Sequence, residues 1–164
     1  MKIIVCDASP LLFLAKLDHL SLIEDILGGK VYVLHCVVEE IRSDKATAAE
    51  TRRLDAFLDE AEIIHFEITE TKASTLSRSD QSTLKWAINH QADWLIADEK
   101  LLRRIALEEG IPVTGFPGLL VEAAKTGRLT VFAAREAVQL AVKRHGCRIS
   151  AAVYHHILAA LDEV

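Results

Sequence analysis

The sequence is poor in cysteine and in uninterrupted apolar segments, and these two absences exclude several classes of protein. Cys6, Cys36 and Cys147 form an odd set without a C-x-x-C pair, which argues against a disulfide framework and against a structural zinc site. Charged residues interrupt the longest apolar stretches within about ten residues, too short a length to span a bilayer. The chain does not open with a basic and then apolar leader, and we expect a cytoplasmic protein with no membrane association.

Excess positive charge and a glycine-rich phosphate loop are also lacking. A net charge of −5 weighs against a protein that coats nucleic acid in general, because phosphate binding needs clustered positive charge. It does not exclude a nuclease, since an acidic metal site would itself contribute part of the negative charge. Gly28 and Gly29 lack the spacing of a phosphate-binding loop, so no nucleotide cofactor is expected.

The pattern of apolar residues predicts an α/β fold. A length of 164 residues with 51% hydrophobic residues fits a single domain over residues 1–164. Strand-like and helix-like segments alternate, which predicts a mainly parallel five-stranded sheet between two helical layers. The expected strands are 3–6, 31–35, 63–66, 94–97 and 111–114, and the expected helices are 11–16, 20–27, 37–41, 46–60, 69–76, 80–91 and 99–109. Beyond Pro117 we expect a helical C-terminal extension, 118–164, with helices at 118–125, 132–144 and 150–161.

Four acids, Asp7, Glu40, Asp80 and Asp98, fall at expected strand ends or on the first turns of expected helices. Asp7 directly follows the first strand, before Ser9 as expected N-cap and Pro10 as first helical residue. Because ligands bind beyond the carboxyl ends of parallel strands, acids far apart in the sequence can meet there. Clustered carboxylates are typical ligands of a hard divalent cation.

Helical periodicity distinguishes among the acids. Around 37–41, Glu40 borders the apolar stripe and Glu39 lies nearly opposite, so Glu40 is the better candidate for an inward ligand. Asp80 heads the core-facing stripe of its helix, where an unpaired charge would be costly.

Each acid also has a simpler interpretation. Asp80 fits the third position of a helix N-terminus capped by Ser77, and Asp98 fits an N-cap. Glu40 alone would be an ordinary solvated residue. A metal site is expected because all four fall at one end of one predicted sheet.

These segments, in this order, resemble the PIN-domain nucleases, especially the toxin-like branch of prokaryotic toxin-antitoxin systems. The similar segments are VCDASPL at 5–11, VVEEI at 37–41, SDQSTL at 79–84 and LIADE at 95–99. GIPVTG at 110–115, GLL at 118–120, RIS at 148–150 and Tyr154 are similar to an uncharacterised prokaryotic PIN-like subfamily. That subfamily often has Gly-Glu where this chain has Ser79 and Asp80, and the shorter reach of Asp80 leaves its role open.

The resemblance implies a PIN-like domain that hydrolyses RNA phosphodiester bonds with Mg²⁺ or Mn²⁺. In this scheme Asp7 and Asp98 are the principal metal ligands, and Glu40 and Asp80 bind the ion directly or through water. Ser9 orients a water or a ligand, and Glu99 is a candidate fifth acid. RNA is then the substrate, and an antitoxin partner and a homodimer are both compatible with the family. The cations that follow Asp98, namely Lys100, Arg103 and Arg104, fit either RNA phosphate or a solvated helix face.

Two other functions remain open. A PIN-like fold with little or no activity would serve as a protein-binding module, with residues 119–164 as the partner surface. A phosphoacceptor receiver domain also gathers acids at this end of a sheet, but it carries paired acids after its first strand, and here Cys6 precedes Asp7. The adjacent His155 and His156 point about 100° apart on a helix and are expected at the surface.

Overall fold

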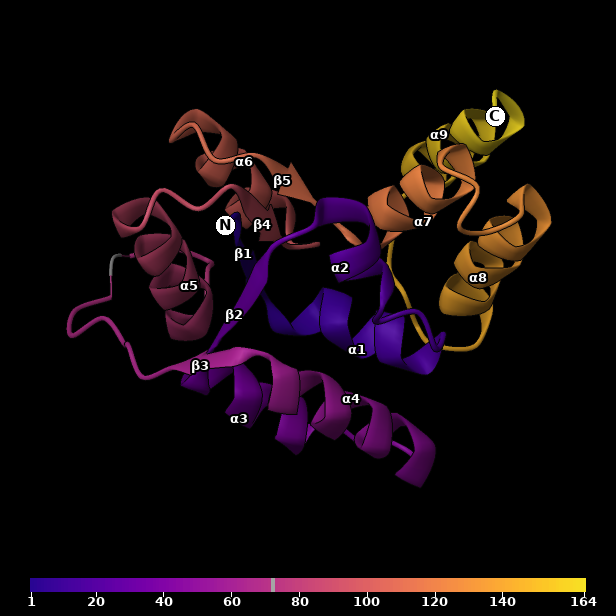
Figure 1. Cartoon of the computed structure of the whole chain (residues 1–164). Coiled ribbons are helices and arrows are strands. Elements are labelled where there is room, and N and C mark those ends of the chain that lie inside the picture. The colour runs from indigo at the N-terminus through magenta and orange to yellow at the C-terminus, as the bar shows by residue number, and fades with distance from the viewer. Residues whose placement is uncertain (72) are drawn as a thin grey trace.

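The computed structural model describes residues 1–71 and 73–164, and strands and helices alternate along them (Figure 1). The strands are β1 (Ile3–Cys6), β2 (Lys30–Leu34), β3 (Glu62–Ile64), β4 (Trp94–Ile96) and β5 (Val113–Thr114). The helices are α1 (Ala8–Lys16), α2 (Leu22–Leu27), α3 (His35–Ser43), α4 (Ala48–Glu60), α5 (Arg78–Asn89), α6 (Lys100–Glu108), α7 (Phe116–Lys125), α8 (Val131–Lys143) and α9 (Ala151–Asp162).

The five strands form one sheet in the order β3-β2-β1-β4-β5, and every neighbouring pair is parallel. The chain adds β2 and β3 on one side of β1, then crosses back to add β4 and β5 on the other. Between β1 and β4 the order therefore reverses, and such switch points are where open α/β sheets bind ligands.

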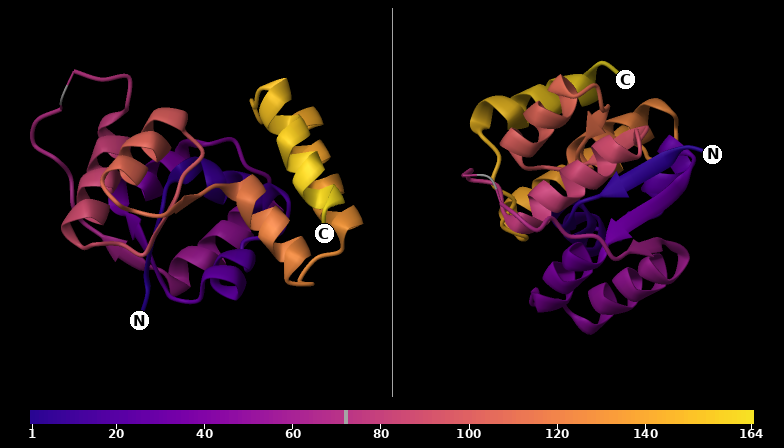
Figure 2. Two further views of the ribbon diagram at one scale, coloured as in Figure 1. Left: turned by 90° about the horizontal axis from the view of Figure 1, so that it is seen from above. Right: turned by 90° about the vertical axis from the view of Figure 1, so that its left-hand side faces the viewer.

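Two helical layers enclose the sheet. Right-handed crossovers place the helices between β1 and β3 on one face and those between β3 and β5 on the other. Accordingly, α5 packs against α6, whereas α1 packs against α3, α4 and α7 (Figure 2). The central strand is buried on both sides, with Ile4, Val5 and Cys6 fully inaccessible. The prediction of a three-layer α/β/α fold with a parallel five-stranded sheet is confirmed.

The last three helices gather at one end of the molecule, away from α5 (Figures 1 and 2). Here α7 contacts α1 and α2 on one side and α8 and α9 on the other. Leu119 and Leu120 of α7 are buried within the core. Hydrophobic packing therefore ties this C-terminal segment to the sheet layers. Among the described residues, no helix combines the length and apolarity needed to cross a bilayer.

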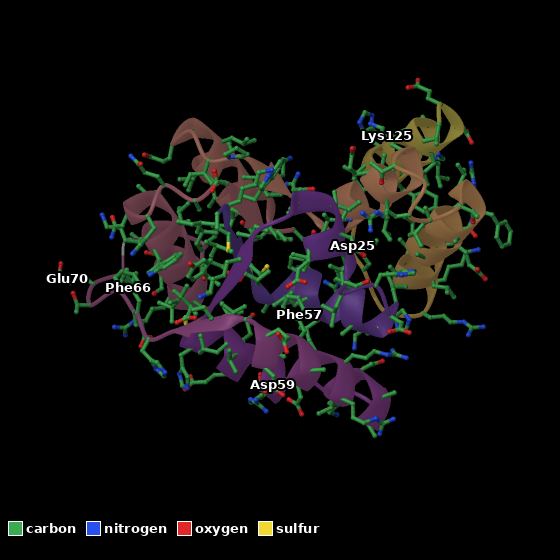
Figure 3. The ribbon with its side chains drawn as sticks, in the orientation of Figure 1. Asp25, Phe57, Asp59, Phe66, Glu70 and Lys125 are labelled. Atoms are coloured by element: carbon green, nitrogen blue, oxygen red, sulfur yellow. The ribbon has the colours of Figure 1, made fainter. Side chains whose placement is uncertain are left out.

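The expected helix over 69–76 is wrong. Lys72 lies outside the described residues, and residues 69–71 and 73–76 follow bends and irregular backbone, with Glu70 at the outer edge (Figure 3). Side chains of α5 hold the preceding backbone: the hydroxyl of Ser82 accepts from the Ile68 N–H at 3.1 Å, and Arg78 donates to the Ile68 carbonyl at 2.7 Å. These bonds compete with a helical backbone pattern.

Candidate active site

Asp7 lies at the switch point. Its backbone N–H donates to the carbonyl of Ile96 at 2.9 Å and so joins the ends of β1 and β4. Asp7, and not Ser9 as expected, occupies the N-cap position of α1, yet its side chain makes no capping hydrogen bond. The residue is only 5% exposed, and among the described residues its buried Oδ1 has no hydrogen-bond partner. A buried carboxylate oxygen without a donor is costly, so the needs of the fold alone do not explain an aspartate at this position.

Asp98 follows β4 and faces Asp7 across the switch point. Its Oδ1 accepts from the backbone N–H of Phe116 at 3.1 Å, and its Oδ2 accepts from the hydroxyl of Ser9 at 3.4 Å. The expectation that Asp98 caps the following helix is wrong, because Glu99 is the N-cap and accepts from the Leu102 N–H at 2.6 Å. Asp98 is thereby left outside the helix and bound to residues that bring it into the site.

The backbone at the start of α7 approaches Asp98 closely. A Cβ atom built on Gly115 would overlap Oδ1 of Asp98 and lie 3.0 Å from the guanidinium of Arg103. That guanidinium donates to the carbonyl of Ala97 at 2.7 Å and so holds the backbone beside Asp98. Sequence reasoning missed the roles of Gly115, Arg103 and the Phe116 N–H. A glycine directly before Phe116 and Pro117 was the signal available for a helix N-terminus close to the acids.

Glu40 and Asp80 complete the acidic cluster from two helices. Glu39 points outward and pairs with His35 at 3.3 Å, whereas Glu40 lies in the groove, as the helical periodicity predicts. Asp80 is half-buried near the start of α5, and its N–H donates to the N-cap hydroxyl of Ser77 at 3.0 Å. The Asp80 backbone thus contributes to capping, and its side chain interacts with Ser77 and with Asp7 where it lines the groove.

Burial raises the pKa values of all four acids, and repulsion by neighbouring carboxylates adds to the increase for Asp7, Glu40 and Asp80. Burial, followed by the charge of Asp80 and then those of Glu40 and Asp98, raises the pKa of Asp7 from 3.8 to about 8. Burial also raises the pKa of Asp98 to about 6, against the opposing effects of the Phe116 N–H and Arg103. For Glu40 and Asp80 the pKa rises chiefly through burial, with Asp80 acting on Glu40 and Glu99 on Asp80. Four carboxylates in this state favour a bound cation or a bound proton.

One groove contains all of the predicted site residues. Its volume is about 1070 Å³, and the acidic part of its lining consists of Asp7, Glu40, Asp80, Asp98 and Glu99, with Ser9 among them. Most of the other residues that line the groove belong to the C-terminal part of the chain, from Gly115 to Ala160. The fold therefore brings together side chains from β1, α3, α5 and β4, as well as an unexpected wall from the last three helices.

The donor set suits a hard divalent cation, although the described residues contain no ready-made group of three His, Cys, Asp or Glu ligands. Mg²⁺ keeps several waters and is typically held by one or two carboxylates plus phosphate oxygens. Asp7 supplies an oxygen without a partner, and Asp98 lies across the switch point from it. These residues fit a water-rich Mg²⁺ or Mn²⁺ site better than a closed protein cage.

Comparison with known proteins agrees with the fold. No curated protein matches the chain. Among solved structures, a PilT N-terminus domain protein from the hyperthermophilic archaeon Sulfolobus solfataricus matches with a TM-score of 0.51 and 18% identity. The match covers 71% of this chain and 89% of that one and shows a shared fold. A family model described as DUF3368, PIN domain, matches residues 3–163, and the chain therefore belongs to this family of PIN domains, which are generally nucleases.

Proposed function

We propose that this protein is a Mg²⁺- or Mn²⁺-dependent endoribonuclease that hydrolyses RNA phosphodiester bonds. The observation that carries the proposal is Asp7, a buried carboxylate without a hydrogen-bond donor on Oδ1, surrounded by three further acids at the switch point of a PIN domain. Neither folding nor capping explains its position, since it makes no capping bond. A bound cation would remove the cost of burying the charge.

The residues divide the work of holding and orienting the reactants. Asp7 and Asp98 would hold the cation, and the Phe116 N–H and the Ser9 hydroxyl fix the direction of the Asp98 carboxylate. Glu40 and Asp80 would help to hold the cation, directly or through water, and would orient water in the groove by accepting hydrogen bonds from it. The chemistry supplied by a bound Mg²⁺ or Mn²⁺ is a lowered pKa for water and stabilisation of charge on the phosphate. No side-chain nucleophile is needed.

Cleavage of labelled RNA by the purified protein tests the proposal. We expect cleavage with Mn²⁺ and none in EDTA. Asp7→Asn and Asp98→Asn should each lower the rate on the order of 100-fold or more, because each removes part of several kcal/mol of charge stabilisation. Glu39→Gln is the matched control and should keep nearly full activity, since Glu39 pairs with His35 outside the groove. Absence of cleavage under all metal conditions would favour a PIN-like protein-binding module instead.

We further propose that the enzyme acts in the cytoplasm as the toxin of a toxin-antitoxin pair. The resemblance to the toxin-like branch supports this role, and three free cysteines are compatible with a reducing compartment. A small protein encoded beside this chain should co-purify with it and suppress cleavage. Expression of the chain alone without any growth defect, and no such neighbouring gene, would contradict the toxin role. Light scattering of the purified chain tests for a homodimer.

A further inference from the structure

Part of the groove wall comes from the C-terminal segment and carries two cations, Lys125 and Arg148, beside one acid, Glu122. Lys125 ends α7, and Arg148 lies between α8 and α9; both line the groove together with Lys100 at the start of α6. Helix α9 presents Val153, His156, Ile157 and Ala160 to the same space, which is the i, i+3, i+4, i+7 spacing of one helix face. Figure 3 shows Lys125 on these C-terminal helices, at the opposite end of the molecule from Glu70.

In the part of the chain that the structure describes, these three cations are not held by ion pairs. Lys100, Lys125 and Arg148 are exposed, and none makes an ion pair with another residue in the described part of the chain. Elsewhere in the same segment two arginines are paired: Arg128 lies 3.4 Å from Asp25, and Arg135 contacts Asp162. Among the described residues Arg144, like Arg148, makes no ion pair. These three cations line one groove without pairing to any acid of the described residues, so they are free to contact a phosphate.

The acids that line the groove, Asp7, Glu40, Asp80 and Asp98, would repel an incoming phosphodiester strand. A bound divalent cation offsets that repulsion only at the phosphate it contacts. The phosphates on either side must then be held by protein cations, because neutralising phosphate charge supplies most of the sequence-independent binding energy. Exposed lysines and an arginine without partners can make such contacts without breaking any ion pair of the fold.

We propose that the C-terminal segment is a substrate-binding element, in which Lys125 and Arg148, together with Lys100 of α6, hold the phosphates that flank the cleaved bond of a nucleic-acid strand. The proposal rests on the proposed nuclease function and assigns to residues 118–164 a role in RNA binding in place of a partner surface. Specificity for base sequence is not expected from these contacts, since phosphate contacts position a strand without reading it.

Two pairs of residues in the same segment provide matched comparisons. Lys125 and Lys143 are the last residues of α7 and α8, and both are exposed, but only Lys125 lines the groove. Arg148 and Arg144 lie four positions apart, and both are exposed, but only Arg148 lines the groove. Any general effect of positive charge or helix-end electrostatics will act on both members of a pair.

The experiment measures binding of a fluorescent single-stranded RNA by anisotropy in Mg²⁺. The full chain carries Asp7→Asn so that the probe is not cut. Lys125→Ala and Arg148→Ala should each raise Kd about threefold to tenfold at low salt and reduce the slope of log K against log salt concentration by about 0.7. Lys143→Ala and Arg144→Ala should leave both quantities unchanged. Melting temperatures should not change in any of the four variants, because none of these side chains makes an ion pair with the residues that the structure describes.

Equal effects within each pair would overturn the inference, and so would binding only of a co-purified protein and not of RNA. Cleavage assays with Asp7 restored keep the two proposals apart. If the chain cleaves RNA but the two variants of each pair bind RNA equally, the nuclease function is supported and the assignment of Lys125 and Arg148 is contradicted. If only Lys125→Ala and Arg148→Ala weaken RNA binding but no metal supports cleavage, RNA binding by these residues is supported and the nuclease function is contradicted.

Discussion

Replacing Asp7 with asparagine should stabilise the metal-free protein at high pH. The pKa of Asp7 rises from 3.8 to about 8 on folding, so the folded state binds this proton more tightly than the unfolded state does. The contribution of Asp7 to the free energy of unfolding of the wild type therefore falls as the pH rises from about 4 to about 8, and it changes no further above that range. Asparagine does not titrate, and the variant lacks this loss.

The size of the effect follows from the shift. At about 1.36 kcal/mol per pKa unit, the free energy of unfolding of the variant relative to wild type should increase by up to about 4 kcal/mol between pH 5 and pH 8. An unpaired buried amide costs about 1–3 kcal/mol, but this cost is the same at every pH. The pH dependence of the difference is therefore diagnostic, whatever its absolute value.

Urea unfolding in EDTA, followed by the fluorescence of Trp86 and Trp94, measures the difference at each pH. Glu39→Gln is the control and should show no such trend, because Glu39 is exposed and outside the groove. A stability difference between Asp7→Asn and wild type that stays constant from pH 5 to pH 8 would refute the reasoning, since Asp7 would then be as well solvated folded as unfolded.

Adding Mn²⁺ at pH 8 extends the same experiment. A ligand that binds only the folded state stabilises it by about 2.7 kcal/mol at a concentration of 100 Kd. Wild type should gain stability of this order, and Asp7→Asn far less, because the substitution removes one of the two proposed principal ligands. A wild type whose stability is indifferent to Mn²⁺ would contradict the metal site itself.

Two further substitutions probe how Asp98 is held. Gly115→Ala should lower the cleavage rate at least about tenfold, because the added Cβ would overlap Oδ1 of Asp98. Gly118→Ala is the control, since its added Cβ would approach the hydroxyl of Thr114, which can rotate away. Equal activity of the two variants would show that Asp98 tolerates displacement. Arg103→Ala should raise the pKa of Asp98 above its wild-type value of about 6 by removing a nearby positive charge, and so move the acidic limb of the pH–rate profile upward. A profile unchanged in Arg103→Ala would show that Asp98 does not set that limb.

The order of the elements could be predicted from the sequence because the strands are short apolar runs bounded by charges and glycines. Residues 3–6 are the clearest case, and the strand is found there with Ile4, Val5 and Cys6 fully buried. The expected helix over 69–76 failed because the bonds that hold the neighbouring backbone come from Arg78 and Ser82, on the helix that follows. A local sequence pattern does not show which backbone N–H and C=O groups will be bound by side chains of the following helix.

Asp7, Asp80 and Asp98 could be expected in the groove because each follows a strand end or begins a helix on one edge of the sheet. Glu40 was expected on a first helical turn but lies in the second turn of α3, which begins at His35, and only its helical face indicated its place. The hydrogen bonds that these acids make could not be predicted from the sequence. A shift of one residue at the start of α6 makes Glu99 the cap and frees Asp98, and helix starts are uncertain by one or two residues in any sequence pattern. The same holds for α1, where Asp7 occupies the cap position that Ser9 was expected to fill. In both cases the aspartate that follows the strand makes no side-chain capping hydrogen bond.

The C-terminal wall could not be predicted at all, because amphipathic helices show which face is buried but not what that face packs against. The missing information lies in the turn from β5 to α7. There Gly115 lets the backbone pass beside Asp98, and the Phe116 N–H binds its carboxylate. Helix α7 therefore begins beside the acids and ends at Lys125, which lines the same groove. One helix thus positions a proposed metal ligand and a proposed phosphate contact, so residues 118–164 belong to the site as much as to the surface.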